Sequence, residues 1–394
     1  MSKAAIISVD GHVRASRSDY RNYVEKRFLD AFDAWARAEE AAGAPESGNL
    51  SAGLDPTSQW DSELRLKDME SQGVVAEVLF PNGLPFQARP ADDVASFADL
   101  EIDRQARLAY NRWLADFCAQ TPGRRAGQAL ISFDDVGLAV EDIHWAKEHG
   151  LGGVMMPALL PGGIFFFDPA LNPVWAACVE AGLPISQHGG SGAPTYGPPG
   201  FAAIMTLALE HSFYSGRSLW QMILGGVFER FPELRVAFIE TEADWIAPAI
   251  RKLDRRLEWD GWTGWAQTLQ RMRQFTGSAR SYWAANCFAG ISPFTEDQVP
   301  LDELARPSAE YQPFCIGSDT AMFGVDYPHF ESVFPETKTR VDALVQHPSI
   351  SADVSRKILY ENAAGLYGFD LDLLAPDMER VGFAVAGAPG LDRR

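Results

Sequence analysis

The chain has 394 residues and a net charge of −19, and 46% of its residues are hydrophobic. That length accommodates one large domain or two medium ones with a sizeable core. The negative charge excludes a nucleic-acid backbone or an anionic membrane surface as the main partner, and no apolar run is long enough to span a membrane.

Cysteine usage and the N-terminus indicate the cellular compartment. The four cysteines are far apart and form no CxxC pair, so neither a disulfide framework nor a cysteine zinc site is expected. The N-terminal apolar run is too short for a signal peptide. We therefore expect a cytoplasmic protein.

Short apolar runs alternate with amphipathic helical stretches along the chain. Eight runs are candidate strands: AAIISVD ending at Asp10, VVAEVLFP ending at Pro81, GQALISF ending at Phe133, GGVMMP ending at Pro157, LPISQHGG around His188, RVAFIETE from Arg235 to Glu242, NCFAGIS around Cys287, and AMFGVD ending at Asp326. Alternating strands and helices predict parallel βαβ units, and eight such units close most simply into a (β/α)8 TIM barrel. A doubly wound open sheet is the alternative, disfavoured because no glycine-rich phosphate-binding motif follows any run.

Two stretches interrupt this repeat. Residues from about 14 to 60 contain a predicted helix over 23–42 and a loop rich in glycine, proline and serine, and residues from about 253 to 280 are rich in tryptophan and basic residues. Loops of such length in a compact domain are often lids or subunit contacts. We expect one barrel domain over residues 1–380 with these two insertions, followed by a C-terminal tail over 381–394.

Polar residues lie at the predicted carboxyl ends of strands, where TIM-barrel active sites are found. The first strand ends in Asp10-Gly-His12, the fifth in His188 and the eighth in Asp326. Because side chains alternate along a strand, Asp10 and His12 can both face the barrel mouth. Imidazole and carboxylate ligands suit zinc, manganese or iron. We predict one divalent ion, with zinc as the first expectation, and no lysine ends the fourth strand to bridge a second ion.

Each of these residues taken alone has a structural interpretation that is at least as good. The Asp-Gly-His stretch could cap a helix, His188 could be a loop histidine with satisfied hydrogen bonds, and Asp326 before Tyr-Pro could close a turn. A ligand set is favoured because all four residues lie at the predicted carboxyl ends of strands that belong to the same barrel.

The chain resembles the amidohydrolase-related family. The resemblance rests on D-x-H at 10–12, QHGG at 187–190, GGVFERFPELRVAFIE at 225–240, FGVDYPH at 323–329 and LYENAAGLYG at 359–368. Family members such as aminocarboxymuconate-semialdehyde decarboxylase and γ-resorcylate decarboxylase hold their metal with residues that correspond to Asp10, His12, His188 and Asp326. The resemblance also implies a homodimer.

One position departs from the family pattern. The decarboxylases carry a histidine after strand six, where this sequence has Thr241. The candidates for the missing catalytic group are His211, Glu240 and His329, although His211 could equally be a structural histidine on a helix.

Substrate binding has weaker candidates in the sequence. A substrate carboxylate would need local cations in so acidic a chain, and Arg14, Arg17 and Arg217 follow strands one and five. Each could equally be a surface cation.

Three functions fit these observations, all with a small molecule as the partner. The first is a mononuclear metal-dependent hydrolase acting on an aromatic or cyclic carbonyl or carboxylate substrate through activated water. It is narrowly preferred because the strand-six histidine is missing. The second is a non-oxidative decarboxylase of an aromatic or unsaturated carboxylic acid, which the resemblance favours. The third, a non-catalytic binding barrel, is disfavoured by the intact ligand set.

Overall fold

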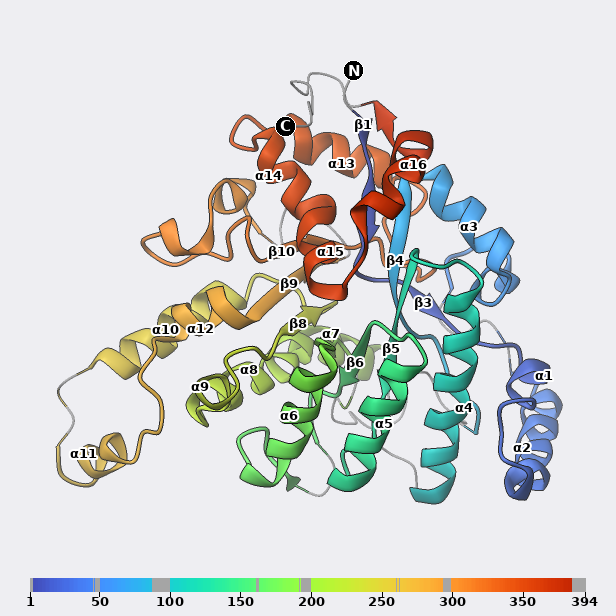
Figure 1. Ribbon diagram of the computed structural model, residues 1–394, viewed down its shortest axis with the longest axis horizontal. Helices are drawn as coiled ribbons and strands as arrows, with labels where there is room; N and C mark the ends of the chain where they lie inside the picture. Colours follow the sequence, from blue (N-terminus) through green and yellow to red (C-terminus); the bar gives the residue numbers. More distant parts are fainter. Residues whose placement is uncertain are drawn as a thin grey trace.

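The computed structural model describes residues 3–384, except residues 45, 47–49, 87–99, 161, 162, 191, 193–199, 260, 262 and 293–298. Parallel strands form a nearly closed barrel in the order β10-β9-β8-β7-β6-β5-β4-β2 (Figure 1). The strands are β2 (Ile6–Ser8), β4 (Val74–Pro81), β5 (Arg125–Leu130), β6 (Gly153–Met156), β7 (Ile185–His188), β8 (Val236–Ile239), β9 (Cys287–Ile291) and β10 (Ala321–Phe323). The predicted TIM barrel is confirmed. Seven of these eight strands fall within a predicted run, and β5 begins two residues before the run that ends at Phe133.

The first and last strands of the barrel meet through irregular hydrogen bonds. The amide of Asp326 donates to the carbonyl of Asp10 at 3.0 Å, and the amide of His12 donates to the carbonyl of Tyr327 at 2.7 Å. β3 (His12–Val13) continues the first strand and pairs with β4, placing His12 opposite Phe80. This seam brings the D-x-H segment and Asp326 together, and it explains why β10 ends at Phe323 rather than at Asp326.

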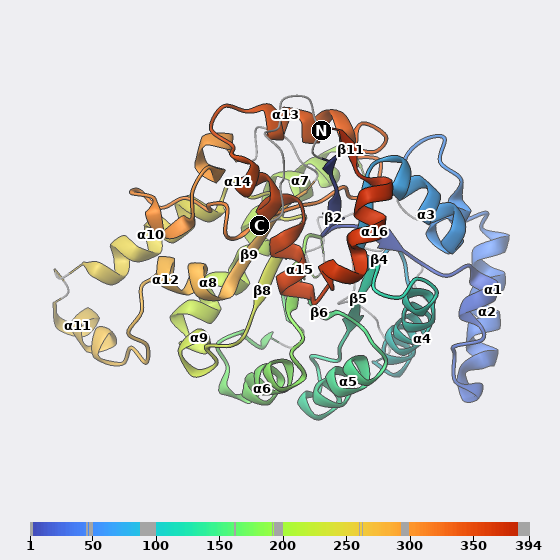
Figure 2. The same cartoon turned by 45° about the horizontal axis from the view of Figure 1, so that its top comes forward.

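Helices cover the outside of the barrel (Figures 1 and 2). They include α3 (Ser62–Ser71), α4 (Leu100–Ala119), α5 (Val136–Glu148), α6 (Asn172–Ala181), α7 (Phe201–Ser215), α8 (Arg217–Leu224), α9 (Val227–Arg230), α13 (Thr337–Gln346), α14 (Ala352–Arg356), α15 (Asn362–Tyr367) and α16 (Leu371–Val381). In α4, Ala106, Tyr110, Trp113 and Phe117 recur at helical spacing and are buried. Burying each of the larger side chains contributes about 1.5–3 kcal/mol, so this stripe holds α4 against the strands.

The first predicted insertion contains α1 (Arg17–Tyr20), the 3-10 turns Lys26–Phe28 and Pro56–Gln59, and α2 (Leu29–Ala41). The helix predicted over 23–42 begins only at Leu29, because the chain is extended at Glu25 and then makes a 3-10 turn. Figure 1 shows α1 and α2 at one edge of the barrel.

The second predicted insertion spans the end of α10 (Ile246–Glu258), α11 (Gly264–Arg271) and the start of α12 (Ala279–Asn286), and in Figure 1 α11 projects away from the barrel at the opposite edge. At the C-terminus, β11 (Phe383–Ala384) pairs antiparallel with β1 (Lys3–Ala4), and the rest of the predicted tail lies outside the described residues. None of the described helices combines the length and the apolar character needed to cross a membrane.

Candidate metal centre and active site

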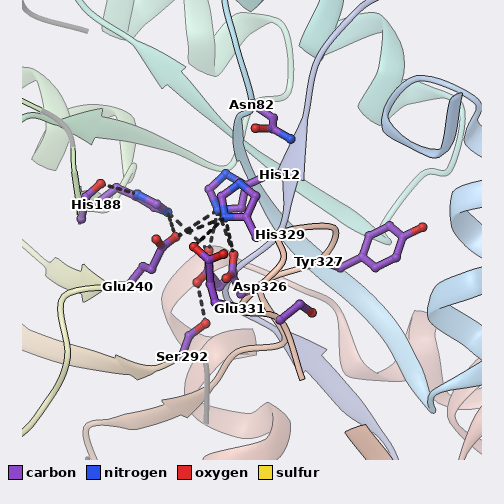
Figure 3. Close-up of polar contacts among 12 residues, drawn as sticks. His12, Asn82, His188, Glu240, Ser292, Asp326, Tyr327, His329 and Glu331 are labelled. Atoms are coloured by element: carbon purple, nitrogen blue, oxygen red, sulfur yellow. Dashed lines mark hydrogen bonds and ion pairs between the residues drawn. The ribbon is translucent and has the colours of Figure 1, made fainter. Parts of the chain in front are cut away.

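Acidic and histidine side chains from four strands converge at the barrel mouth (Figure 3). Their ligand atoms fall into two overlapping groups, within each of which all atoms lie within 4.8 Å of one another. One group is Asp10, His12, His188 and Glu240, and the other is His12, Glu240, Asp326 and His329. Asp10, His12, His188 and Asp326, the four residues predicted as ligands, all lie in this cluster and are buried.

Distances around His12 indicate a shared cation. Its Nε2 lies 3.3 Å from Asp10 Oδ1, 3.2 Å from Glu240 Oε2 and 3.3 Å from Asp326 Oδ1. One imidazole nitrogen carries at most one proton and cannot donate to three oxygens. Ligand atoms held about 2.1 Å from one ion are separated by roughly 3.0–3.4 Å in octahedral or tetrahedral geometry. The spacing therefore fits a coordination shell better than a hydrogen-bond network.

The second nitrogen of each histidine defines its tautomer. Nδ1 of His12 lies 3.3 Å from the carbonyl of Pro81, and Nδ1 of His188 lies 2.9 Å from the carbonyl of Gly189. Since a carbonyl only accepts, each Nδ1 carries the proton and each Nε2 directs a lone pair into the cluster. A backbone partner that fixes the tautomer in this way is typical of metal-ligating histidines.

Two acids reach the cluster through left-handed backbone conformations. Glu240 has φ of 49° directly after β8, and Asp326 has φ of 60° shortly after β10. Non-glycine residues rarely adopt such angles, and when they do they are often at functional sites. Each turn ends an apolar strand and aims a carboxylate at the barrel mouth.

Two residues outside the cluster form hydrogen bonds to its members. Ser292, which follows β9, donates through Oγ to Asp10 Oδ2 at 2.5 Å. Arg65 of α3 is fully buried, donates to the carbonyl of His12 at 2.8 Å, and forms two bonds of 2.8 Å to the carboxylate of Glu77. Sequence reasoning missed both, although the strand-end rule that selected Asp10 also applies to Ser292.

The electrostatics of the cluster favour a cation. Burial, and then the charge of Asp10, raise the pKa of Asp326 to about 7. Burial alone would raise the pKa of Asp10, but hydrogen bonds from His12 and His188 outweigh it and lower that pKa. Carboxylates that compete for the same protons in a buried site are stabilised by a divalent ion. The cluster therefore has the composition and charge of a divalent-metal site.

The three candidate catalytic residues lie in different places. Glu240 is part of the cluster, with Oε2 at ligand distance from His12 and His188. His329 stacks on His12 with ring centroids 3.7 Å apart, and its Nδ1 lies 2.9 Å from Asp326 Oδ1 without hydrogen-bonding geometry. Burial, and then the charge of His12, lower the pKa of His329 to about 3.

His211 on α7 lies beside the cluster rather than in it. Its Nε2 donates to the backbone carbonyl of Glu240 at 2.6 Å. A Cβ on Gly189 would come within 2.2 Å of that nitrogen and 1.9 Å of that carbonyl, so this position requires glycine. His211 thus braces the left-handed turn at Glu240.

The three candidate arginines also differ. Arg17 is bonded to the carbonyl of Ala44 and forms a 3.9 Å ion pair with Glu46. Arg217 is half-buried at the start of α8 and makes no ion pair within the part of the chain that the structure describes. Arg14 follows β3 directly and is buried.

Comparisons with known proteins place this site in a family. An amidohydrolase from Mycobacterium avium subsp. paratuberculosis K-10 has a similar structure, with a TM-score of 0.67 and 21% identity over 93% of this chain and 99% of that chain. A dihydroxybenzoic acid decarboxylase from Polaromonas sp. JS666, with bound manganese and the inhibitor 2-nitroresorcinol, gives a TM-score of 0.62 and 18% identity over 94% and 98%. At these identities the likeness shows a shared fold.

A curated relative and a family model extend the comparison to sequence. 2-amino-3-carboxymuconate-6-semialdehyde decarboxylase from Dictyostelium discoideum is 25% identical over 192 residues. That match spans 45% of this chain and 47% of the relative, about half of each. The model of the amidohydrolase family matches residues 9–369, which include the whole cluster. The chain therefore belongs to the amidohydrolase family.

Proposed function

We propose that the protein is a metal-dependent, non-oxidative decarboxylase of a hydroxylated aromatic or unsaturated carboxylic acid. The observation that carries the proposal is the convergence of Asp10, His12, His188, Glu240 and Asp326 in two overlapping groups that share His12 and Glu240. The decarboxylases named among the relatives support it. The narrow preference for hydrolysis, drawn from Thr241, loses weight because the structure supplies another histidine, His329, inside the cluster.

Asp10, His12, His188 and Asp326, with Glu240, would hold one divalent ion. When bound, such an ion supplies Lewis-acid chemistry that binds and polarises the substrate carboxylate and a neighbouring oxygen. Zinc and manganese both suit a set of two imidazoles and several carboxylates, and the manganese-bound relative makes manganese an equal candidate. Competitive loading with the two ions would identify the preferred one.

His329 is the proposed proton carrier. Its buried imidazole would take the proton of the hydroxyl next to the carboxylate and return it to the ring carbon. The bond from that carbon to the carboxylate then breaks, its electron pair restores the aromatic ring, and carbon dioxide leaves. His211 would act by positioning Glu240.

The first experiment measures metal and product together. Purified protein should contain about one ion per chain, and His188→Ala should lose the ion and the activity while remaining folded by circular dichroism. A panel of hydroxybenzoates should release carbon dioxide, measured by a coupled assay. Metal-replete protein that releases none, yet cleaves lactones or amides, would establish hydrolysis instead.

We also infer a homodimer, as the family resemblance implies. Support comes from α7, whose Phe201, Ile204 and Leu209 are 84%, 61% and 78% exposed. Large apolar side chains gathered on one helix commonly mark an interaction surface. Light scattering after gel filtration would determine the mass in solution.

A further inference from the structure

Arg14 is a buried cation that forms no ion pair with the described residues. Five arginines are buried among the described residues: Arg14, Arg65, Arg107, Arg124 and Arg125. Four of them have a carboxylate partner, namely Glu77 for Arg65 and Arg125, Asp103 for Arg107, and Glu70 for Arg124. Arg14 forms no ion pair with any described residue, although it is only 7% exposed. Arg14 therefore differs from the other four buried arginines in having no carboxylate partner among the described residues.

The hydrogen bonds of Arg14 do not replace a counter-charge. Its Nε donates a long hydrogen bond, of 3.5 Å, to the carbonyl of Ala15, and a guanidinium has four further N–H groups. Glu39 and Glu46 act on it only at longer range, and burial lowers the pKa of Arg14. An unpaired buried charge opposes folding, so a structural role gives no reason to keep it.

Arg14 directly follows the segment that carries two residues of the cluster. β3 ends at Val13, so the backbone of Arg14 lies about 7 Å beyond that of His12 along an extended chain. β4 continues alongside, since the amide of Asn82 donates to the carbonyl of Val13 at 2.8 Å.

The neighbouring chain leaves room for the guanidinium. A Cβ on Gly83 would come within 2.9 Å of Arg14 Nη1, and Gly83 has φ of +123°. The carbonyl of Gly83 is held by the hydroxyl of Tyr20, at 2.9 Å. Glycine at this position therefore lets the guanidinium of Arg14 lie directly against the backbone.

We propose that Arg14 forms an anion subsite that binds a second anionic group of the substrate, separate from the carboxylate at the metal centre. Two observations separate the Arg14 subsite from the metal centre. Arg14 makes no ion pair with Asp10, Glu240 or Asp326, and it lies one strand repeat beyond His12. The ligand class is thus a dicarboxylate or another dianion. This proposal rests on the proposed function in one respect: the dianion that binds at Arg14 is the substrate of that reaction.

The test compares stability and ligand affinity in three variants of the full-length chain. Arg14→Met removes the unpaired charge, and Arg17→Met removes a paired charge from the same segment. Arg65→Met removes a buried charge and leaves Arg125 as the only ion-pair partner of Glu77 among the described residues. Melting temperatures are measured without ligand, and the affinities of metal-loaded protein for isophthalate and benzoate are measured by calorimetry.

Arg14→Met should melt no lower than wild type, whereas Arg65→Met should melt several degrees lower. Arg14→Met should bind isophthalate roughly 10–100-fold more weakly, and benzoate with less than about a threefold change. Arg17→Met should bind both as wild type does. A melting temperature that falls as far in Arg14→Met as in Arg65→Met, or an unchanged affinity for isophthalate, would overturn the subsite. Both readouts are independent of turnover, so a failure to release carbon dioxide would count against the proposed function alone.

Discussion

Replacing Ser292 by alanine tests whether Asp10 is held as a ligand. Ser292 Oγ bonds to Asp10 Oδ2 at 2.5 Å, while Asp10 Oδ1 faces both His12 and His188 at 3.3 Å. The substitution leaves the carboxylate in place and removes only the bond that fixes its orientation. Loss of a partner behind a ligand lowers metal affinity by about 10–100-fold, or about 1.4–2.7 kcal/mol.

The assay is a metal titration against a competing chelator, with wild type and Ser292→Ala side by side. Ser318→Ala is the matched control, because Ser318 is equally buried and its hydroxyl has no hydrogen-bond partner among the described residues. Metal-free Ser292→Ala should also lose about 1.5–3 kcal/mol of unfolding free energy, the value of a hydrogen bond to a charged group. Metal affinities within twofold of wild type would refute the assignment of Asp10 as an oriented ligand.

Three further predictions concern the proton carrier, acid stability and assembly. His329→Asn should keep its metal while turnover falls by about 100-fold or more, and loss of the ion instead would make His329 a ligand. Hydrogen bonding to Arg380 lowers the pKa of Glu70 from 4.5 to about 2, so its contribution is present above pH 4.5 and disappears as the pH falls toward 2. In urea unfolding, the free energy of unfolding of Glu70→Gln should be lower than that of wild type by about 1 kcal/mol at pH 7 and by less at pH 3. The effect is small because solvent screens this partly exposed ion pair. Leu209→Lys should shift the protein toward monomer in light scattering, whereas Leu373→Lys on α16 should not.

The sequence predicted the barrel because each strand carries its own signal. Runs such as VVAEVLFP are buried along their whole length, as strands covered by helices must be. The residues brought together at the mouth could also be predicted, because parallel strands place their carboxyl ends at one edge. D-x-H and Asp326 needed no knowledge of side-chain conformation to be placed near each other.

What the sequence could not predict depends on backbone turns and distant pairing. Nothing in the letters around Glu240 indicates a left-handed turn that directs its carboxylate into the cluster rather than beside it. The state of Arg14 was equally hidden, because a paired and an unpaired arginine look the same in a sequence. Only the absence of an ion-paired carboxylate among the described residues distinguishes it from Arg65.

The cluster and the Arg14 subsite share one physical feature: both are incomplete without a ligand. Both oxygens of Asp326 are buried without hydrogen-bonding geometry to any described residue. Arg14 is a buried cation that forms no ion pair within the described part of the chain. Either feature alone lowers the free energy of unfolding. Their charges are opposite, so a divalent ion completes one and an anionic group completes the other. Because Asp10 and His12 of the cluster lie on one continuous segment with Arg14, a dianionic acid that reaches from the ion to the guanidinium would satisfy both at once.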